Sequence, residues 1–290
     1  MRVEKYIFVG NRRFVLEEMQ SSGLKIVKVI VVKGSHLEKD LQNGLLQDLK
    51  NIEFIVNKSE LLEIIRDTEF DFLISNGCPY ILPIDDLPTA KYINIHPSCL
   101  PDLRGVDPVI GAVLCDREAG ASCHIMDRGI DTGQIVSQVR IPMTDDLDVT
   151  LLYQLSFIAE RQAFAVALSR NFKPAFSQVE KSDLVYYTRR LEDRQITFFE
   201  PNKIILRKIR AFSNRSAGCE FMIKGCIIKV YSAHVIRNTY LSKILEKFED
   251  CVIALSFENS IVFKKDGQAL RFGNLVYPIG FRLSEGDFLI

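Results

Sequence analysis

Hydrophobic positions in the first third of the chain come in short continuous runs rather than in alternation with polar ones. These runs occupy residues 6–10, 26–32, 52–56 and 70–74. Residues 14–21 and a segment beginning near Ser59, the expected N-cap, have the spacing of helices. Continuous apolar strands separated by helices indicate an α/β fold, with a parallel sheet covered on both faces.

The same pattern predicts where a ligand binds. Open parallel sheets bind ligands at the carboxyl ends of their strands. Two segments are expected there, residues 75–80 after one strand and the loop that follows His96 after a strand at 91–96. A further strand at 135–141 precedes a predicted helix at 148–171.

From about residue 200 the pattern changes. A short helix at 204–212 is followed by brief apolar pieces separated by turns such as Lys265-Asp266-Gly267. These pieces lie at 227–231, 252–257, 261–263 and 269–272. The pattern predicts a small β-barrel or β-sandwich, and so a division into a first domain at 1–200 and a second domain at 201–290.

Composition narrows the class of protein. Of the 290 residues 47% are hydrophobic and 26% charged, as in ordinary soluble proteins. No apolar run is long enough to span a bilayer, Met1 to Ile7 carries charges, and the seven cysteines are scattered without a Cys-x-x-Cys pair. We expect a cytoplasmic protein with no membrane partner, no disulfide framework and no bound metal.

The formal net charge of zero conceals an asymmetry along the chain. Residues 201–290 hold 14 Lys and Arg against 8 Asp and Glu, which leaves 23 against 29 in residues 1–200. A basic second domain suits an anionic partner such as a nucleotide or RNA. A solvated surface with no such partner explains the surplus equally well.

One constellation of residues offers chemistry. Asn94 and His96 are two apart on a predicted strand, so their side chains share a face, and Pro97 ends the strand. Asp131 follows in the sequence Gly129-Ile-Asp-Thr-Gly133. An imidazole beside a carboxylate can move a proton near neutral pH, and an amide can stabilise an oxyanion. These roles suffice for acyl transfer to an amine.

Plainer interpretations compete with this one. A single His before Pro is commonly a loop residue, and Asp-Thr-Gly is also a simple turn or the motif of aspartic proteases. The protease interpretation is disfavoured because the motif occurs once, in an α/β pattern. Cys99, Cys115 and Cys123 lack an evident catalytic partner and are interpreted as small core residues.

Longer motifs favour the acyl-transfer interpretation. Asn94-Ile-His96-Pro-Ser98-Cys-Leu-Pro101, Arg104-Gly105, residues 120–127 and Ile130-Asp131-Thr-Gly133 resemble the formyltransferases that use 10-formyltetrahydrofolate. The resemblance covers roughly residues 1–200, with Cys99 where the family usually has Leu. It implies a Rossmann-like sheet with helices on both faces, followed by a β-barrel-like (OB-like) domain. Arg215-Ser-Ala-Gly218 departs from the usual Pro-Trp-Pro-Gly of that domain.

The resemblance also implies roles for individual residues. The catalytic residues would be Asn94, His96 and Asp131. Protonated His96 and Asn94 would stabilise the oxyanion, and Asp131 would orient His96 and raise its pKa. The residues expected against the folate are Tyr80, Ile81, Leu82, Asp127, Arg128, Gly129 and Ile130. Ser98 and Arg104 are expected to contact the acceptor substrate.

The acceptor amine is less sharply indicated. Methionyl-tRNA formyltransferases resemble the chain in layout, but they carry a basic Gly-Arg-Gly loop that residues 32–44 lack. Tyr186-Tyr-Thr-Arg-Arg190 with Asp193 is similar to the linker of amino-sugar formyltransferases. We therefore expect a nucleotide-linked amino sugar, such as a dTDP-4-amino-4,6-dideoxy sugar for surface (lipopolysaccharide) polysaccharide, rather than nucleic acid. Methionyl-tRNA and a small amine such as hydroxyornithine are the alternatives, and the second domain offers a surface for a homodimer.

Overall fold

The protein is described by a computed structural model covering residues 2–214 and 217–289. Its chain divides into two compact units. The first unit comprises residues 1–109, 118–143 and 153–187, and the second comprises residues 110–117, 144–152 and 188–290. Each unit has its own sheet and its own core.

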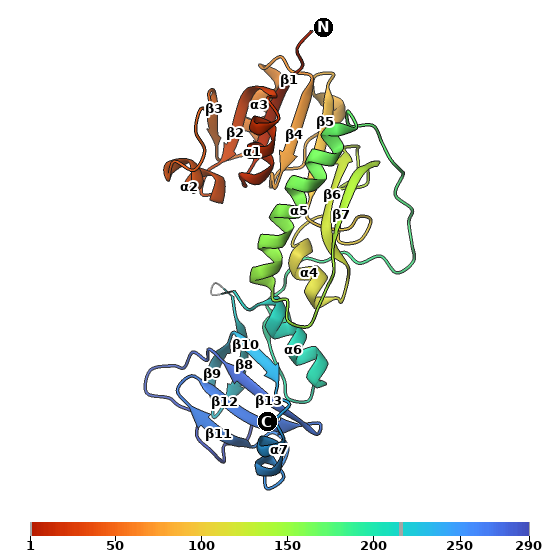
Figure 1. Cartoon of the computed structure of the whole chain (residues 1–290). Helices are drawn as coiled ribbons and strands as arrows, with labels where there is room; N and C mark the ends of the chain where they lie inside the picture. The colour runs from red at the N-terminus through yellow and green to blue at the C-terminus, as the bar shows by residue number, and fades with distance from the viewer. Residues whose placement is uncertain (1, 215–216, 290) are drawn as a thin grey trace. The chain divides into compact units, whose positions relative to one another are not determined.

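A seven-stranded sheet in the order β3-β2-β1-β4-β5-β6-β7 forms the first unit (Figure 1). Its strands are β1 (Lys5–Gly10), β2 (Lys25–Val32), β3 (Ile52–Ile55), β4 (Phe72–Asn76), β5 (Lys91–His96), β6 (Ala119–Ile125) and β7 (Ile135–Ile141). Neighbours from β3 to β5 pair in parallel, while β6 runs antiparallel to both β5 and β7. The predicted α/β sheet is confirmed as mainly parallel, and the antiparallel β6 was not predicted.

Helices accompany this sheet along the sequence. They are α1 (Phe14–Ser21), α2 (His36–Gln42), α3 (Lys58–Arg66), α4 (Pro108–Leu114), which lies largely in the second unit, and α5 (Val149–Ser169). The expectation that Ser59 caps α3 is wrong. The cap is Asn57, whose Oδ1 accepts from the Glu60 amide at 3.0 Å, while the Glu60 carboxylate accepts from the Val56 amide at 2.9 Å.

Alternation along the buried strands supplies apolar side chains to both faces of the sheet. On one face Ile7 and Leu73 pack in a cluster with Leu61 and Ile65 of α3. The opposite face carries other aromatic contacts: Phe72 lies 5.2 Å, between ring centroids, from Phe172 just after α5. Phe14 of α1 contacts Phe157 of α5 at 5.6 Å between ring centroids. Helices therefore cover both faces, as predicted.

The second unit is rich in antiparallel strands. Its elements are α6 (Asn202–Ala211), β8 (Cys219–Ile223), β9 (Cys226–Val230), β10 (Ser232–Val235), α7 (Thr239–Leu245), β11 (Ile253–Phe257), β12 (Ser260–Lys265) and β13 (Gln268–Gly273). They form a sheet in the order β10-β13-β12-β11 and a β8-β9 hairpin. Phe198, Phe221, Phe263 and Phe272 form its aromatic core. The predicted β-rich region is confirmed, whereas closure into a barrel stays a prediction.

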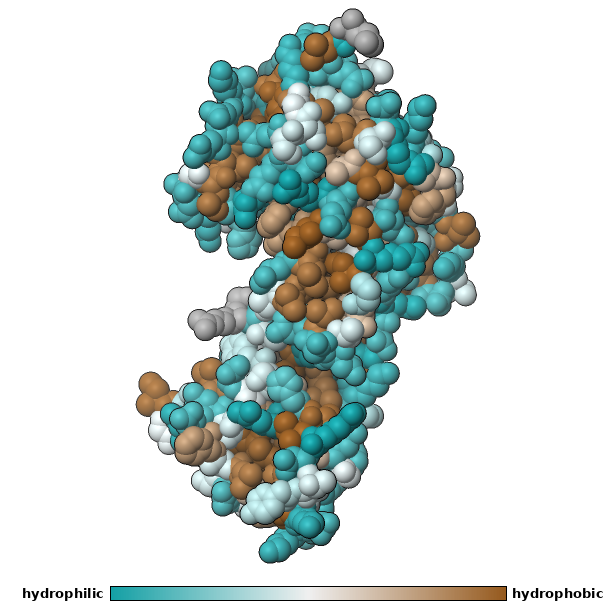
Figure 2. Space-filling model, viewed as in Figure 1, coloured by the Kyte–Doolittle hydropathy of each residue, from teal (hydrophilic) through white to brown (hydrophobic). Residues whose placement is uncertain are grey.

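The surface in view is mostly hydrophilic, and its broadest hydrophobic area lies over α5 (Figure 2). Ile158 and Val166 of this helix are 47% and 46% exposed. Across residues 2–214 and 217–289, no helix is both long and apolar enough to cross a membrane.

Short 3₁₀ turns at Ile84–Asp86 and Glu192–Arg194 complete the regular structure.

Candidate active site

Asn94 and His96 lie at the carboxyl end of β5, where the register of the neighbouring strand adds another polar residue. The antiparallel pairing of β5 with β6 sets Asn94 opposite His124. Asp131 follows β6 in the loop to β7 and has a φ of +53°. A positive φ is uncommon for residues with a Cβ, although Asp and Asn adopt it more often than others. The strand ends and this loop bring four polar side chains together.

The Asp131 carboxylate is the centre of this group. Its Oδ1 accepts from Asn94 Nδ2 at 3.0 Å and lies 3.2 Å from His124 Nε2. Its Oδ2 accepts from the Gly105 amide at 2.9 Å and lies 3.4 Å from His96 Nδ1. The three residues expected to be catalytic are thus in direct contact, although they come from separate parts of the sequence.

His96 is buried, with one ring nitrogen already engaged. Its Nε2 lies 2.8 Å from the carbonyl oxygen of Leu103, which can only accept, so Nε2 carries the proton. Nδ1, beside Asp131, is then the nitrogen that gains or loses a proton. Leu103 has a φ of +60°, a second left-handed residue in contact with His96. The backbone around the imidazole is therefore held in an unusual conformation on both sides.

Burial dominates the electrostatics of His96. It lowers the pKa of the imidazole, and the attraction of the Asp131 carboxylate, which raises the pKa, does not restore the ordinary value. The expectation that Asp131 raises this pKa is right for its own contribution, but the net shift is downward. His96 is therefore neutral at neutral pH before reaction, and Nδ1 can accept a proton; its protonated role during turnover stays a prediction.

The pKa of the Asp131 carboxyl is lowered, so the group stays ionised. Burial alone would raise the pKa of this carboxyl, but His96, His124 and the Gly105 amide together hold it well below its usual range. A buried carboxylate with several donors remains charged at neutral pH. The site thus holds one fixed negative charge beside a neutral imidazole.

Sequence reasoning missed His124 as a member of the site. Its Nδ1 lies 3.0 Å from the Ile125 carbonyl oxygen, so that nitrogen carries a proton. Its Nε2 lies 3.2 Å from both Asn94 Nδ2 and Asp131 Oδ1, and with the ring proton on Nδ1 it accepts from the amide. The sequence feature that could have identified it is the family motif at residues 120–127, which contains His124 and covers the end of β6 beside β5.

A cavity of about 500 Å³ in the first unit opens onto these groups. Asn94, His96, His124 and Asp131 line one part of it, and apolar side chains line much of the rest. Six of the residues expected against the folate line the cavity: Tyr80, Ile81, Leu82, Asp127, Gly129 and Ile130. Arg128 does not; its guanidinium is mostly exposed and lies 2.5 Å from Asp85. The size and mixed lining are typical of small-molecule sites.

The loop from Asp127 to Gly133 forms one wall and is fixed by its own hydrogen bonds. Asp127 Oδ1 accepts from Thr132 Oγ1 at 2.6 Å and from the Gly129 amide at 3.0 Å. Gly133 cannot carry a side chain here, because a Cβ would come within 1.8 Å of the Ile125 carbonyl oxygen. The Asp127 carboxylate therefore shapes the loop, which leaves backbone groups and Ile130 to face a ligand.

Neither residue expected to contact the acceptor lies among the cavity lining. Ser98 is buried, and its Oγ donates to the Asp102 carbonyl at 2.8 Å. Arg104 is only 4% exposed, and its guanidinium donates to Gln178, Glu180 and Tyr186. The contacts of both side chains are therefore within the protein.

Two further lining residues follow β1 and were not singled out from the sequence. Asn11 and Arg12 stand at the carboxyl end of that strand, where the rule for parallel sheets already predicts ligand contacts. The guanidinium of Arg12 pairs with the fully buried Glu160, at 2.5 Å between Nη2 and Oε1. Burial raises the pKa of that carboxyl, while Arg12 opposes the shift. Arg12 thus brings a partly neutralised cation to the cavity.

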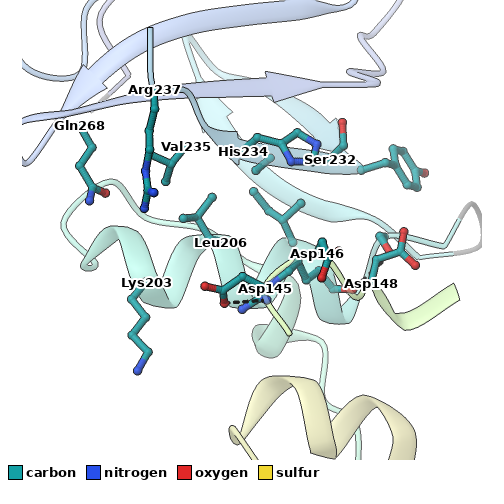
Figure 3. A pocket seen from close by; sticks show the side chains of 15 residues that line it. Asp145, Asp146, Asp148, Lys203, Leu206, Ser232, His234, Val235, Arg237 and Gln268 are labelled. Carbon is teal, nitrogen blue, oxygen red and sulfur yellow. Dashed lines mark hydrogen bonds and ion pairs between the residues drawn. The ribbon is translucent and has the colours of Figure 1, made fainter. Parts of the chain in front are cut away.

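A second cavity, of about 610 Å³, belongs wholly to the second unit. Figure 3 shows Lys203, Gln268 and Arg237 toward one end and three aspartates toward the other. The aspartates have partners: Asp145 accepts from Arg210 at 3.1 Å, Asp148 accepts from the Leu151 amide at 2.9 Å, and Asp146 accepts from Thr144. None of the residues expected at the active site lies here, so the first cavity is the candidate active site.

Among residues 2–214 and 217–289, no group of three or more His, Cys, Asp or Glu side chains is arranged to hold a metal ion. Acid–base and hydrogen-bonding groups are what the described residues bring to the first cavity. Cys99 and Cys123, which line neither cavity, are buried, and burial raises the pKa of the Cys99 thiol to about 12.

Comparison with known proteins connects this geometry to a family. The family model described as formyl transferase matches residues 19–168. A methionyl-tRNA formyltransferase from Paraburkholderia phytofirmans is 30% identical over 236 residues, covering 79% of this chain and 70% of that protein. One from Janthinobacterium is 29% identical over 236 residues, covering 80% and 73%.

Solved structures show the same fold at lower identity. WlaRD, a sugar 3N-formyl transferase determined with dTDP and 5-N-formyl-THF, has a TM-score of 0.70 and 20% identity, covering 97% of this chain and 100% of that one. An N-formyltransferase from Helicobacter canadensis, determined with folinic acid and dTDP-3-aminofucose, has a TM-score of 0.70 and 19% identity, covering 94% and 99%.

Proposed function

The chain belongs to the formyl transferase family and is an N-formyltransferase, and from that premise we propose that it transfers the formyl group of 10-formyltetrahydrofolate to the free amine of a nucleotide-linked amino sugar. One observation carries the proposal. Asn94, His96 and Asp131, distant in sequence, meet at one part of a cavity whose remaining wall is largely apolar. The product serves surface polysaccharide synthesis in this proposal.

The residues of the cavity fit a folate. The pterin is a flat ring with a hydrogen-bonding edge, and the cavity offers apolar side chains of Leu82, Ile84 and Ile130 beside a loop rich in backbone groups. Tyr80 is held in place because its hydroxyl donates to the Val56 carbonyl at 2.9 Å. When bound, the folate supplies a formyl group on a nitrogen whose bond to the formyl carbon breaks as the bond to the acceptor amine forms.

His96 is suited to take the proton that the attacking amine must lose. Its Nε2 is bound to the Leu103 carbonyl, its lowered pKa leaves Nδ1 free of a proton, and the Asp131 carboxylate stabilises the cation that forms. The protonated Nδ1 can return its proton to the leaving nitrogen. The imidazole thus starts as a base and ends as one.

Asn94 is suited to stabilise negative charge on the formyl oxygen. One N–H of its amide is used by Asp131. The same nitrogen lies 3.2 Å from His124 Nε2, and Asn94 lines the cavity, so a formyl oxygen bound there can share its second N–H. Preorganised donors of this kind lower a barrier by about 3–4 kcal/mol.

The sugar acceptor is supported by two observations. The stretch at 32–44, where the tRNA enzymes carry a basic loop, forms α2 here, capped by the Ser35 hydroxyl and by Glu38, which accepts from the Gly34 amide at 2.6 Å. Two solved structures of like fold are named as sugar N-formyltransferases. Methionyl-tRNA is the second candidate acceptor, because the curated relatives are named for it.

The test is an acceptor panel. The protein is incubated with 10-formyltetrahydrofolate and, in separate reactions, with dTDP-, UDP- and GDP-linked 3- and 4-amino sugars and with initiator methionyl-tRNA. We expect tetrahydrofolate release, and a sugar that gains the mass of one formyl group, with an amino-sugar nucleotide only. Formylation of the charged tRNA and of no sugar would overturn the sugar proposal while supporting formyl transfer itself.

A variant of the proposed base separates binding from chemistry. His96→Asn should lose turnover, while the affinity for the non-reactive 5-formyltetrahydrofolate, measured by calorimetry, is retained. Near-normal turnover in this variant would refute the role given to His96.

A further inference from the structure

The segment that follows α5 runs back along the first unit as extended chain without a helix (Figure 1). We call residues 174–186 the return segment. Near its start the Ala175 amide donates to the Ile135 carbonyl at 2.8 Å. Near its end the Leu103 amide donates to the Val185 carbonyl at 2.8 Å. The return segment thus joins β7 to the loop that holds His96.

Gln178, in the middle of this segment, contacts the Asp131 loop through its amide. Its Nε2 donates to the carbonyl oxygens of Asp131 and Gly133, both at 2.8 Å. These bonds use both N–H groups of the amide. They fix the carbonyls on either side of Thr132, and so fix the direction in which the Asp131 side chain leaves the backbone.

Arg104 holds Gln178 from the other side. Gln178 Oε1 accepts from Arg104 Nη2 at 2.8 Å and from Nε at 3.1 Å. The remaining guanidinium nitrogen donates to Glu180 at 2.6 Å and to Tyr186 at 3.1 Å. The next residue, Gly105, donates its amide to Asp131 Oδ2. The Asp131 backbone and its carboxylate are therefore held from adjoining parts of one network.

We propose that Gln178 is a positioning residue for the catalytic carboxylate, holding Asp131 in its left-handed conformation against His96, with Arg104 fixing the Gln178 amide. This inference rests on the proposed function for its kinetic readout alone. Asp131 has a left-handed backbone, with a φ of +53°, which Asp adopts more readily than most residues but which still has to be held in one place. The two bonds from Gln178 supply that constraint.

The test variant is Gln178→Met, which preserves length and removes the donors and the acceptor without adding charge. The charged or titratable groups that act on His96 are Asp131, His124 and Arg12. If Asp131 moves away from Nδ1, the carboxylate attracts the imidazolium less, so the midpoint of His96 titration falls. NMR can follow this titration because the chain has four histidines.

We expect the His96 midpoint to fall in Gln178→Met and kcat to fall by between about 10-fold and 10²-fold, with the KM values for both substrates unchanged. Gln134→Met is the matched control, because Gln134 Nε2 donates to Ser177 of the same segment at 3.3 Å without contacting Asp131. It should leave the His96 midpoint and kcat unchanged.

An unchanged His96 midpoint in Gln178→Met would overturn the inference, whatever happens to stability or activity. Should that variant not fold, Arg104→Lys gives the same readout from the other side, since lysine cannot donate twice to Gln178. An absence of formyl transfer by the wild-type protein with every acceptor would overturn the proposed function, while the His96 titration would still decide the positioning role.

Discussion

Asn94 and His124 face each other across the antiparallel pair β5-β6, with Asn94 Nδ2 3.2 Å from His124 Nε2. Both also contact the same oxygen of Asp131. The amide that we propose to stabilise the formyl oxygen therefore has its orientation set by an imidazole as well as by a carboxylate. The candidate active site has four interacting polar residues rather than three.

This relationship predicts the effect of removing the second imidazole. In His124→Gln, a neutral amide replaces the ring that bridges Asn94 and Asp131, so the Asn94 amide is less well oriented. We expect kcat to fall by about 10-fold or more, with folate affinity retained. Steady-state kinetics and calorimetry measure the two effects. His36→Gln, on exposed α2, is the control and should behave as wild type; an unaltered kcat in His124→Gln would contradict the role.

Asp131→Asn tests the charge at the centre of the site. The pKa of His96 is already lowered by burial, and Asp131 is the main influence that raises it. Removing the carboxylate should therefore lower the His96 titration midpoint further below its ordinary value of about 6.5, and lower kcat by about 10² to 10⁴-fold. NMR titration measures the first effect. A His96 titration midpoint that is unchanged or higher in this variant would show that the carboxylate does not act on His96.

The part of this site that could be predicted from the sequence is the part that depends on residues close together in the chain. Asn94 and His96 share a strand, so spacing alone places them together, and the carboxyl-end rule locates the cavity. His124 was missed because it lies on β6, whose Ala, Gly, Ser and His residues form no continuous apolar run, and because the long-range pairing of β6 with β5 sets it opposite Asn94. The burial of Arg104 depends on Gln178 and Glu180, over 70 residues away, and no local pattern specifies that pairing.

Ser98 illustrates how a motif residue can act within the fold. Its hydroxyl donates to the Asp102 carbonyl, and the side chain is not among the residues lining the cavity. Ser98→Ala should lower the free energy of unfolding by about 1 kcal/mol, because the partly buried Asp102 carbonyl loses its donor. KM for the acceptor should not change. Urea unfolding and steady-state kinetics test both statements, and a raised acceptor KM at wild-type stability would instead indicate substrate contact.

The hydrogen bond from the Gly105 amide to Asp131 predicts that a side chain at position 105 impairs catalysis. Its amide donates to Asp131 Oδ2 at 2.9 Å from a backbone with a φ of +85°, and a Cβ placed there would meet no atom within 4 Å. Gly105→Ala therefore fits sterically but disfavours the conformation that aims the N–H at the carboxylate. We expect a loss of about 1 kcal/mol in the free energy of unfolding, together with a fall in kcat.

Gly44 provides the matched control for that substitution. Like Gly105, it has a positive φ, of +70°, and a Cβ placed on it would meet no atom within 4 Å. It follows α2 and is not among the residues lining the cavity. Gly44→Ala should lose a similar free energy of unfolding while kcat is retained. Comparing the two variants by urea unfolding and kinetics separates backbone strain from the hydrogen bond to Asp131. Equal kcat values in the two variants would show that the Gly105 amide does not support catalysis.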